Sequence, residues 1–80
     1  MQTSIMLYRE VKNSVRYYSM RIYLTLFNEY ILEKKYGAIK NARPTGAVSQ
    51  HYDNIHNAFT AMKKTIALKA KKGYRINKTK

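Results

Sequence analysis

The residues best suited to chemistry are one tyrosine and the basic side chains that surround it in the sequence. Tyr36 belongs to the string KKYG, and two further basic residues follow within seven positions. An aromatic ring can stack on a base or a sugar while nearby cations hold phosphates. The pattern therefore predicts a nucleic-acid contact, the alternative being a half-buried tyrosine within a solvated basic surface. The basic members are Lys34, Lys35, Lys40 and Arg43.

A second aromatic-basic group lies in residues 15–27, where side chains alternate along a predicted strand. Tyr17, Arg21 and Tyr23 fall on one face, and the other face is apolar. Tyrosines on a free sheet face can form a stacking platform for bases. Packing on the N-terminal strand or on a partner chain is an equally good interpretation. The apolar face consists of Tyr18, Met20, Ile22, Leu24 and Leu26.

Catalytic and metal chemistry find little support in the sequence. His51 and His56 lie five residues apart, and Asp53 is the one acidic residue between them; this is no recognised metal-ligand spacing. The four acids form no acid–base pair, and the three glycines form no phosphate loop. We therefore expect a domain that is not an enzyme and that uses no cofactor and no metal.

The charge balance indicates a polyanionic partner. The 80 residues hold 16 Lys and Arg against 4 acids, a net charge of +12, and no Cys. Such an excess attracts nucleic acid over long range. Eight of the basic residues lie from Lys63 onward, and no acid follows Asp53. We expect the late lysines to add diffuse attraction: Lys63, Lys64, Lys69, Lys71 and Lys72.

These residues need a scaffold, and their periodicity predicts an antiparallel sheet. Strands are expected at residues 5–11, 15–27, 30–36 and 47–52, with turns at 12–14 and 27–29. Gly37 is expected to form a tight turn because glycine tolerates positive φ. Residues 40–46 hold the only Pro and form a basic loop.

The period changes to that of a helix after Asp53. Asn54 or Asp53 can cap the first turn, Gly73 can end the helix, and Tyr74 can fold back onto the last turn. The fold class is thus α+β: a meander of three to four strands with one C-terminal amphipathic helix on one face. We expect residues 1–80 to form one domain, with 75–80 as a flexible basic tail. The apolar stripe of the helix is Ile55, Ala58, Phe59, Met62, Ile66 and Ala70.

Several strings in this order resemble the WGR domain, a module found in DNA-dependent poly(ADP-ribose) polymerases and in small stand-alone bacterial proteins. The resemblance covers about residues 5–76. It rests on NSVRYY at 13–18, LEKKYGAI at 32–39 and KKGY at 71–74, with Gly46 opening a strand and Ala58-Phe59 in the helix. The signature Trp-Gly-Arg reads Tyr36-Gly37-Ala38 here.

The resemblance implies DNA binding, at ends, nicks or single strands, with Tyr36 in the position of the stacking Trp. Asn13 and Arg16 fall in the family's turn that approaches the nucleic-acid backbone. Ala38 cannot make the contacts of the signature Arg, which in the polymerases helps relay binding to other domains. The resemblance therefore implies nucleic-acid binding without that relay, with DNA favoured over RNA.

Two other functions compete with nucleic-acid binding. An adaptor that docks on an acidic protein surface would use the same charge. Binding to an anionic membrane would need the apolar face of the helix, which the core also needs, so we expect no membrane partner. The N-terminal residues show no secretory signal, and no apolar run could span a bilayer. We expect a cytoplasmic protein.

Overall fold

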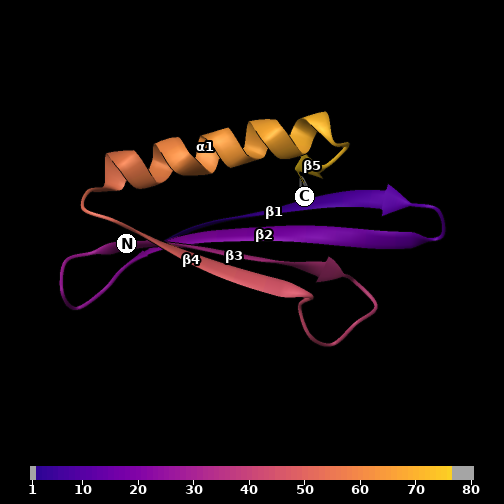
Figure 1. Cartoon of the computed structure of the whole chain (residues 1–80), viewed down its shortest axis with the longest axis horizontal. Coiled ribbons are helices and arrows are strands. Elements are labelled where there is room, and N and C mark those ends of the chain that lie inside the picture. The colour runs from indigo at the N-terminus through magenta and orange to yellow at the C-terminus, as the bar shows by residue number, and fades with distance from the viewer. Residues whose placement is uncertain (1, 77–80) are drawn as a thin grey trace.

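The computed structural model describes residues 2–76 and shows one antiparallel sheet covered by one helix (Figure 1). The strands lie in the order β4-β3-β2-β1-β5. The predicted α+β class is confirmed, with one strand more than expected. The elements are β1 (Gln2–Val11), β2 (Ser14–Leu24), β3 (Tyr30–Ala38), β4 (Gly46–Tyr52), α1 (Ile55–Lys71) and β5 (Arg75–Ile76).

Two hairpins connect the first three strands. Lys12 and Asn13 alone join β1 to β2, and Lys12 takes a positive φ of 55°. The second strand ends at Leu24, so the prediction of a strand through residue 27 was wrong. The reason is local, because the Thr25 hydroxyl accepts hydrogen bonds from two backbone N–H groups of the turn. The turn leaves Leu26 fully exposed instead of placing it in the core.

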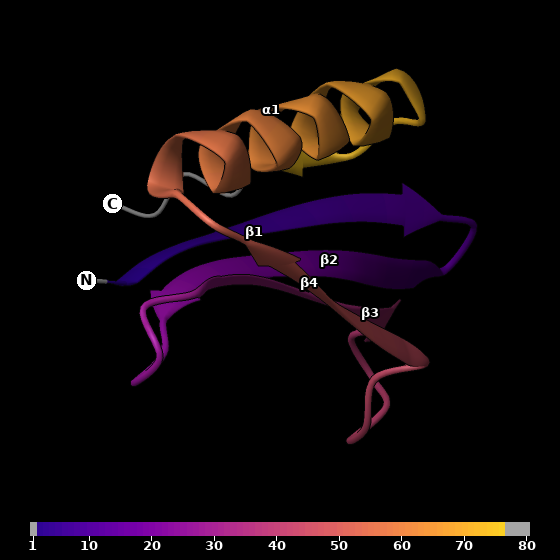
Figure 2. The same ribbon diagram turned by 60° about the vertical axis from the view of Figure 1, so that its left-hand side comes forward.

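The core lies between the sheet and α1 (Figure 2). Alternate residues of β2 point toward the helix, as the period-two pattern predicted, and Met20 and Ile22 are almost fully buried there. Phe59 and Ile66 of the helix pack against this cluster. Its buried members are Leu7, Tyr18, Met20, Ile22, Leu32, Ala58 and Met62.

The helix begins and ends where the sequence predicted. Asn54 caps it by accepting a hydrogen bond of 2.8 Å from the Asn57 N–H, and Gly73 follows its end with a φ of 100°. The expected tail is partly ordered, because Arg75 and Ile76 form β5 and pair with Tyr8 and Leu7 of β1. Residues 77–80 lie outside the described residues.

Candidate nucleic-acid interface

Tyr36 lies on the helix side of β3 and is held between two neighbours. Its ring stacks on the ring of Tyr18, the cross-strand partner, with 5.4 Å between centroids and 5° between planes. On the other side it covers Gly46 of β4, where a Cβ atom would lie 2.5 Å from the ring. The strand therefore needs glycine at this position so that Tyr36 can lie across it. Such aromatic covering of a strand glycine also fixes the ring.

Gly37 is a strand residue and not the positive-φ turn that the sequence predicted. A Cβ atom here would approach the backbone nitrogen of Thr45 to 2.8 Å, which is shorter than side chains allow. That nitrogen donates a hydrogen bond of 2.8 Å to the Tyr36 carbonyl oxygen. The glycine thus lets the β3–β4 loop close against Tyr36. Ala38, in the position of the signature arginine, is buried with an exposed fraction of 5%.

A pocket of about 350 Å³ opens beside Tyr36, between the sheet and the last turns of the helix. Three tyrosines and three cations from β2, β3, α1 and the segment after α1 converge on it, and none of its lining residues is acidic. Strand alternation explains the set, because Lys34 and Tyr36 share a face of β3 that β2 continues. The lining residues are Arg16, Tyr18, Lys34, Tyr36, Val48, Lys69 and Tyr74.

Lys69 and Tyr74 complete the pocket from the C-terminal side. The Tyr74 N–H donates to the Lys69 carbonyl oxygen at 3.1 Å, so the chain folds back as predicted. The ring of Tyr74 meets Tyr18 edge-on at 6.1 Å. The Lys69 ammonium lies 4.4 Å from the Tyr18 ring centroid, within the range of a cation–π contact. Arg9 lies over the Tyr74 ring, 5.4 Å from its centroid, and donates to the Lys72 carbonyl oxygen at 2.8 Å.

The pocket concentrates positive charge. Burial lowers the pKa of Lys34 below its usual range. Burial also lowers the pKa of Lys69, and repulsion from Lys72, Lys34 and Arg9 lowers it further. The shift of Lys69 thus includes repulsion between neighbouring cations, whereas that of Lys34 comes from burial alone. A phosphate entering the pocket would relieve this repulsion.

Two acids of the chain are engaged elsewhere. Glu33 points to the sheet face opposite the helix, by strand alternation, and binds Arg21 at 2.8 Å. Glu29 contacts His51 at 3.4 Å near the β2–β3 turn. The cations of the pocket therefore stay available to an external anion.

The structure separates the residues that the sequence grouped around Tyr36. Lys34 lies beside it, but Lys35 points to the opposite face of the sheet and is exposed. Lys40 and Arg43 are exposed in the β3–β4 segment, and Asn13 is exposed in the β1–β2 turn. Both connections lie at the same end of the molecule as the C-terminal half of α1 (Figure 1).

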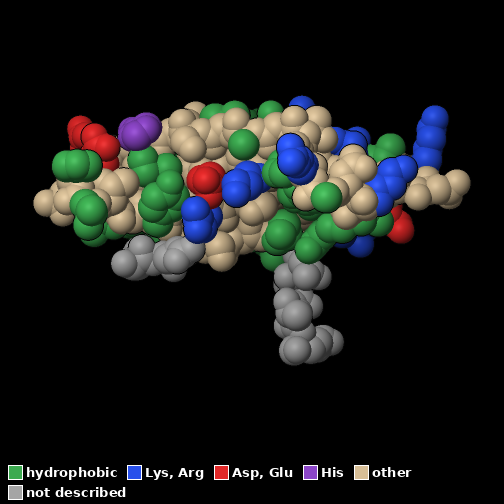
Figure 3. Space-filling model, turned by 90° about the horizontal axis from the view of Figure 1, so that it is seen from below, with side chains coloured by type: hydrophobic (Ala, Val, Ile, Leu, Met, Phe, Trp, Pro, Cys, Tyr) green, Lys and Arg blue, Asp and Glu red, His purple; other side chains and the backbone are tan. Residues whose placement is uncertain are grey.

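By strand alternation, the second predicted group lies on the sheet face opposite the helix, the side seen in Figure 3. Tyr17 lies between Tyr8 of β1 and Gly37 of β3 in the strand register. Arg21 is held by Glu33 and stacks over Tyr23 at 4.6 Å. This group faces away from the pocket, so the two predicted groups lie on two separate surfaces.

Sequence reasoning missed five members of the pocket region: Arg9, Tyr18, Val48, Lys69 and Tyr74. Tyr18 was interpreted only as core, and Lys69 only as diffuse charge. Strand alternation alone could have shown that Lys34, and not Lys35, lies on the same face as Tyr36, since only residues of even number share that face. The meeting of the helix end with β2 depends on tertiary packing that no local pattern reveals.

The fold and pocket define a small basic α+β module with a pocket lined by tyrosines and cations. The family model of the WGR domain matches residues 1–80, and the chain belongs to this family, which is generally linked to nucleic-acid binding. No curated protein and no solved structure matched the chain. Within residues 2–76, no helix is long and apolar enough to cross a membrane, and no cluster of potential metal ligands occurs.

Proposed function

We propose that this domain binds nucleic acid, DNA in preference to RNA, in the pocket beside Tyr36, and that it is a binding module and not an enzyme. One observation carries the proposal: Arg16, Lys34 and Lys69 meet three tyrosines in a cavity with no acidic lining. Cations supply phosphate contacts, and tyrosine faces and edges supply contacts to a sugar or base.

The size and position of the pocket favour a strand end or a single-stranded segment. A cavity of about 350 Å³ admits a nucleotide-sized group but no double helix. The terminal nucleotide of a strand, or a base unstacked from its neighbours, would enter it. The flanking duplex or strand would then run past the exposed Lys40, Arg43 and Asn13.

The residues on the opposite sheet face contribute less to binding. They are Tyr17, Arg21, Tyr23 and Lys35. They lie on the opposite sheet face, where they can contact only a second segment of nucleic acid. Arg21 already has Glu33 as its partner, so its guanidinium attracts phosphate less strongly than the free cations of the pocket do.

Fluorescence anisotropy tests the proposal with four labelled ligands of equal length: intact duplex with hairpin-closed ends, open duplex, nicked duplex and single-stranded DNA. We expect affinity that falls steeply as salt rises, and tighter binding to ligands with accessible strand ends or unpaired bases. An RNA of the same sequence tests the DNA preference. Failure to bind any ligand at low salt would contradict the proposal.

Tyr36→Ala locates the binding surface, with Tyr17→Ala as the matched control on the opposite face. We expect Tyr36→Ala to weaken binding to ends and single strands by about 10-fold, since stacking of a base on an aromatic ring contributes about 1–3 kcal/mol. Tyr17→Ala should change the affinity much less. Equal losses of affinity in the two variants would contradict end binding in the pocket. So would a loss in Tyr36→Ala that is as large for the closed duplex as for ends and single strands.

The competing adaptor function predicts a different result. An acidic protein surface would engage the cations through charge alone, so Tyr36→Ala would leave the interaction intact. Association with such a partner would also survive nuclease treatment. Nucleic-acid binding as proposed here is weakened by removing the Tyr36 ring as well as by removing the charge.

A further inference from the structure

The most exposed large hydrophobic residues of the described chain lie together at the turn between β2 and β3. Leu26 is 99% exposed and Phe27 is 85% exposed, and Leu24 precedes them at 41%. We call these three residues the apolar tip. A tight turn usually carries polar residues, so two adjacent bare hydrophobic side chains at one turn indicate a contact surface.

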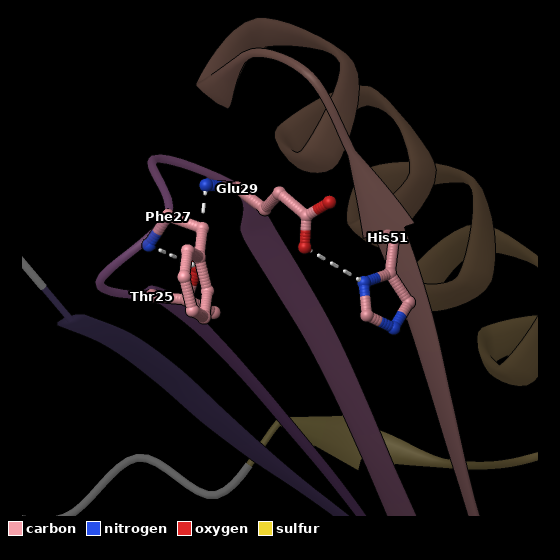
Figure 4. Close-up of polar contacts among 4 residues, drawn as sticks. All are labelled: Thr25, Phe27, Glu29 and His51. Atoms are coloured by element: carbon pink, nitrogen blue, oxygen red, sulfur yellow. Dashed lines mark hydrogen bonds and ion pairs between the residues drawn. The ribbon is translucent and has the colours of Figure 1, made fainter.

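The apolar tip is presented by an ordered turn (Figure 4). The Thr25 hydroxyl accepts hydrogen bonds from the N–H groups of Phe27 at 3.2 Å and Glu29 at 3.3 Å. The Thr25 N–H donates to the Glu29 carbonyl oxygen at 2.8 Å, and Asn28 takes a positive φ of 63°. A side chain on an ordered turn loses little entropy on binding, which favours association.

The tip also lies in the part of the molecule that lacks positive charge. Residues 22–33 and 44–62 contain no Lys or Arg, although 16 of the 80 residues are basic. Six residues of β2 separate Tyr18 in the pocket from Leu24, a distance of about 20 Å at the usual rise per strand residue. The space-filling view shows this polarity, with basic side chains over the centre and right and none at the left end (Figure 3).

We propose that two copies of this chain associate through their apolar tips. Each copy carries a charge of +12, so two copies repel each other wherever their basic surfaces meet. The tip end is where they can approach without that repulsion. A two-fold contact is self-complementary, so Leu26 and Phe27 of one copy would cover the same residues of the other.

The charge at the tip rules against nucleic acid as the occupant. Glu29 and Asp53 are the charged residues of the turn and of the strand–helix junction nearby, and both would repel phosphate. Glu29 already contacts His51. A second copy meets the tip with the apolar side chains of Leu26 and Phe27, while the Glu29 of each copy keeps its contact with His51.

This arrangement would turn one binding module into a bridge. With the tips at the centre, the two pockets lie at the outer ends of the pair, and this consequence rests on the proposed function. An interface of so few side chains is far smaller than that of a permanent dimer. We therefore expect rapid, reversible pairing that becomes strong only when nucleic acid gathers several copies.

Sedimentation equilibrium of the nucleic-acid-free protein tests the pairing directly. Measurements at protein concentrations up to about 1 mM and in about 0.5 M salt, where repulsion is screened, should show a mass rising from 9.4 kDa toward twice that value. The double variant Leu26→Ser with Phe27→Ser should remain a monomer. Leu68→Ser is the control, because Leu68 is an exposed helix residue away from the tip.

Circular dichroism keeps the test independent of folding, since both substituted positions are exposed and should leave the spectrum and Tm unchanged. A wild-type mass that stays at the monomer value throughout would overturn the proposal. Pairing that persists in the tip variant, or that is lost in Leu68→Ser, would overturn it as well.

A bridging assay separates this proposal from nucleic-acid binding. A biotinylated oligonucleotide on beads should capture a second, fluorescent oligonucleotide in the presence of the wild-type protein. The tip variant should bind the first oligonucleotide with unchanged affinity but capture at least 10-fold less of the second. Loss of both readings would overturn the tip proposal, because it would place nucleic-acid contacts at the tip.

Discussion

The two ends of the β2–β3 ladder show how one pair of strands can carry opposite surfaces. Near the C-terminal end of the helix, the cross-strand pair of Tyr18 and Tyr36 lies among Arg16, Lys34 and Lys69. At the β2–β3 turn, the cross-strand pair of Leu24 and Tyr30 is followed by exposed hydrophobic side chains. The backbone pairing is the same at both ends, so the difference lies in which elements cover them.

The helix explains much of this difference. Its C-terminal turn brings Lys69 over Tyr18, while its N-terminal turn begins at Asn54 beside a segment without basic residues. Charge is therefore concentrated where the pocket opens and is absent where the tip projects. The comparison implies that substitutions at one end should leave the function of the other end intact.

The largest expected effect comes from removing charge inside the pocket. The double variant Lys34→Gln with Lys69→Gln should bind single-stranded DNA at least about 100-fold more weakly at low salt, since hydrogen bonds to charged groups contribute about 1.5–3 kcal/mol each. Lys63→Gln with Lys64→Gln removes the same charge from the exposed helix surface. It should lower affinity only a few-fold, as anisotropy titration would show.

The slope of affinity against salt sharpens this result. The pocket variant should lower the slope by about two units, because two phosphate contacts and their released counterions are lost. Pairing through the tip should be unchanged or slightly stronger. Equal effects of the two double variants would mean that the domain attracts nucleic acid by overall charge and that the pocket has no special part.

A steric change at Gly46 should damage the pocket end alone. Gly46→Ala places a methyl group 2.5 Å from the present position of the Tyr36 ring, so the ring must leave Tyr18. We expect a loss of about 1–3 kcal/mol in the free energy of unfolding, typical of overpacking. Urea denaturation measures this loss. In the double variant Gly46→Ala with Tyr36→Ala, most of the loss caused by the added methyl group should disappear, and a loss that remains would place the strain elsewhere.

The sequence predicted most of the fold because its signals are local. Alternation in residues 15–24 and the helical stripe from Ile55 fix which faces meet, and Asn54 and Gly73 mark the helix ends. The end of β2 was misplaced because the hydrogen bonds of Thr25 outweigh the continued alternation through Leu26. Here turn chemistry prevails over periodicity.

The site was less predictable because it depends on contacts distant in sequence. Tyr36 was singled out by its basic neighbours, but strand pairing places Lys35 on the other face and brings in Tyr18. Lys69 and Tyr74 reach the pocket only through the packing of α1 on the sheet. Proximity in sequence therefore overstates the cluster around Tyr36 and misses most of the other residues that line its pocket.

The order of the tip depends on one hydroxyl group. Thr25→Val keeps the β-branched shape but removes the acceptor for the N–H groups of Phe27 and Glu29. Because these groups are exposed, water replaces the lost bonds in part, and we expect a destabilisation of about 0.5–1 kcal/mol by urea denaturation. Tip pairing should weaken several-fold, and DNA binding should not change. A change in DNA affinity would contradict the independence of the two ends.

The smallest effect is the pH dependence of stability at low salt. The pKa values of Lys34 and Lys69 are lowered in the folded chain by burial, so the unfolded chain holds protons that the folded chain has released. Stability should therefore rise with pH through these lowered pKa values, up to the ordinary lysine value of about 10.4. Burial raises the pKa of Tyr18, so above about pH 10 its proton opposes the trend, because the unfolded chain loses that proton first. Between about pH 8 and 10, the free energy of unfolding measured with urea should rise by only a few tenths of a kcal/mol, since solvent screens both lysines.

The rise should vanish in Lys34→Gln with Lys69→Gln and persist in Lys63→Gln with Lys64→Gln. If it persisted in the pocket variant, the two pocket lysines would not be its source.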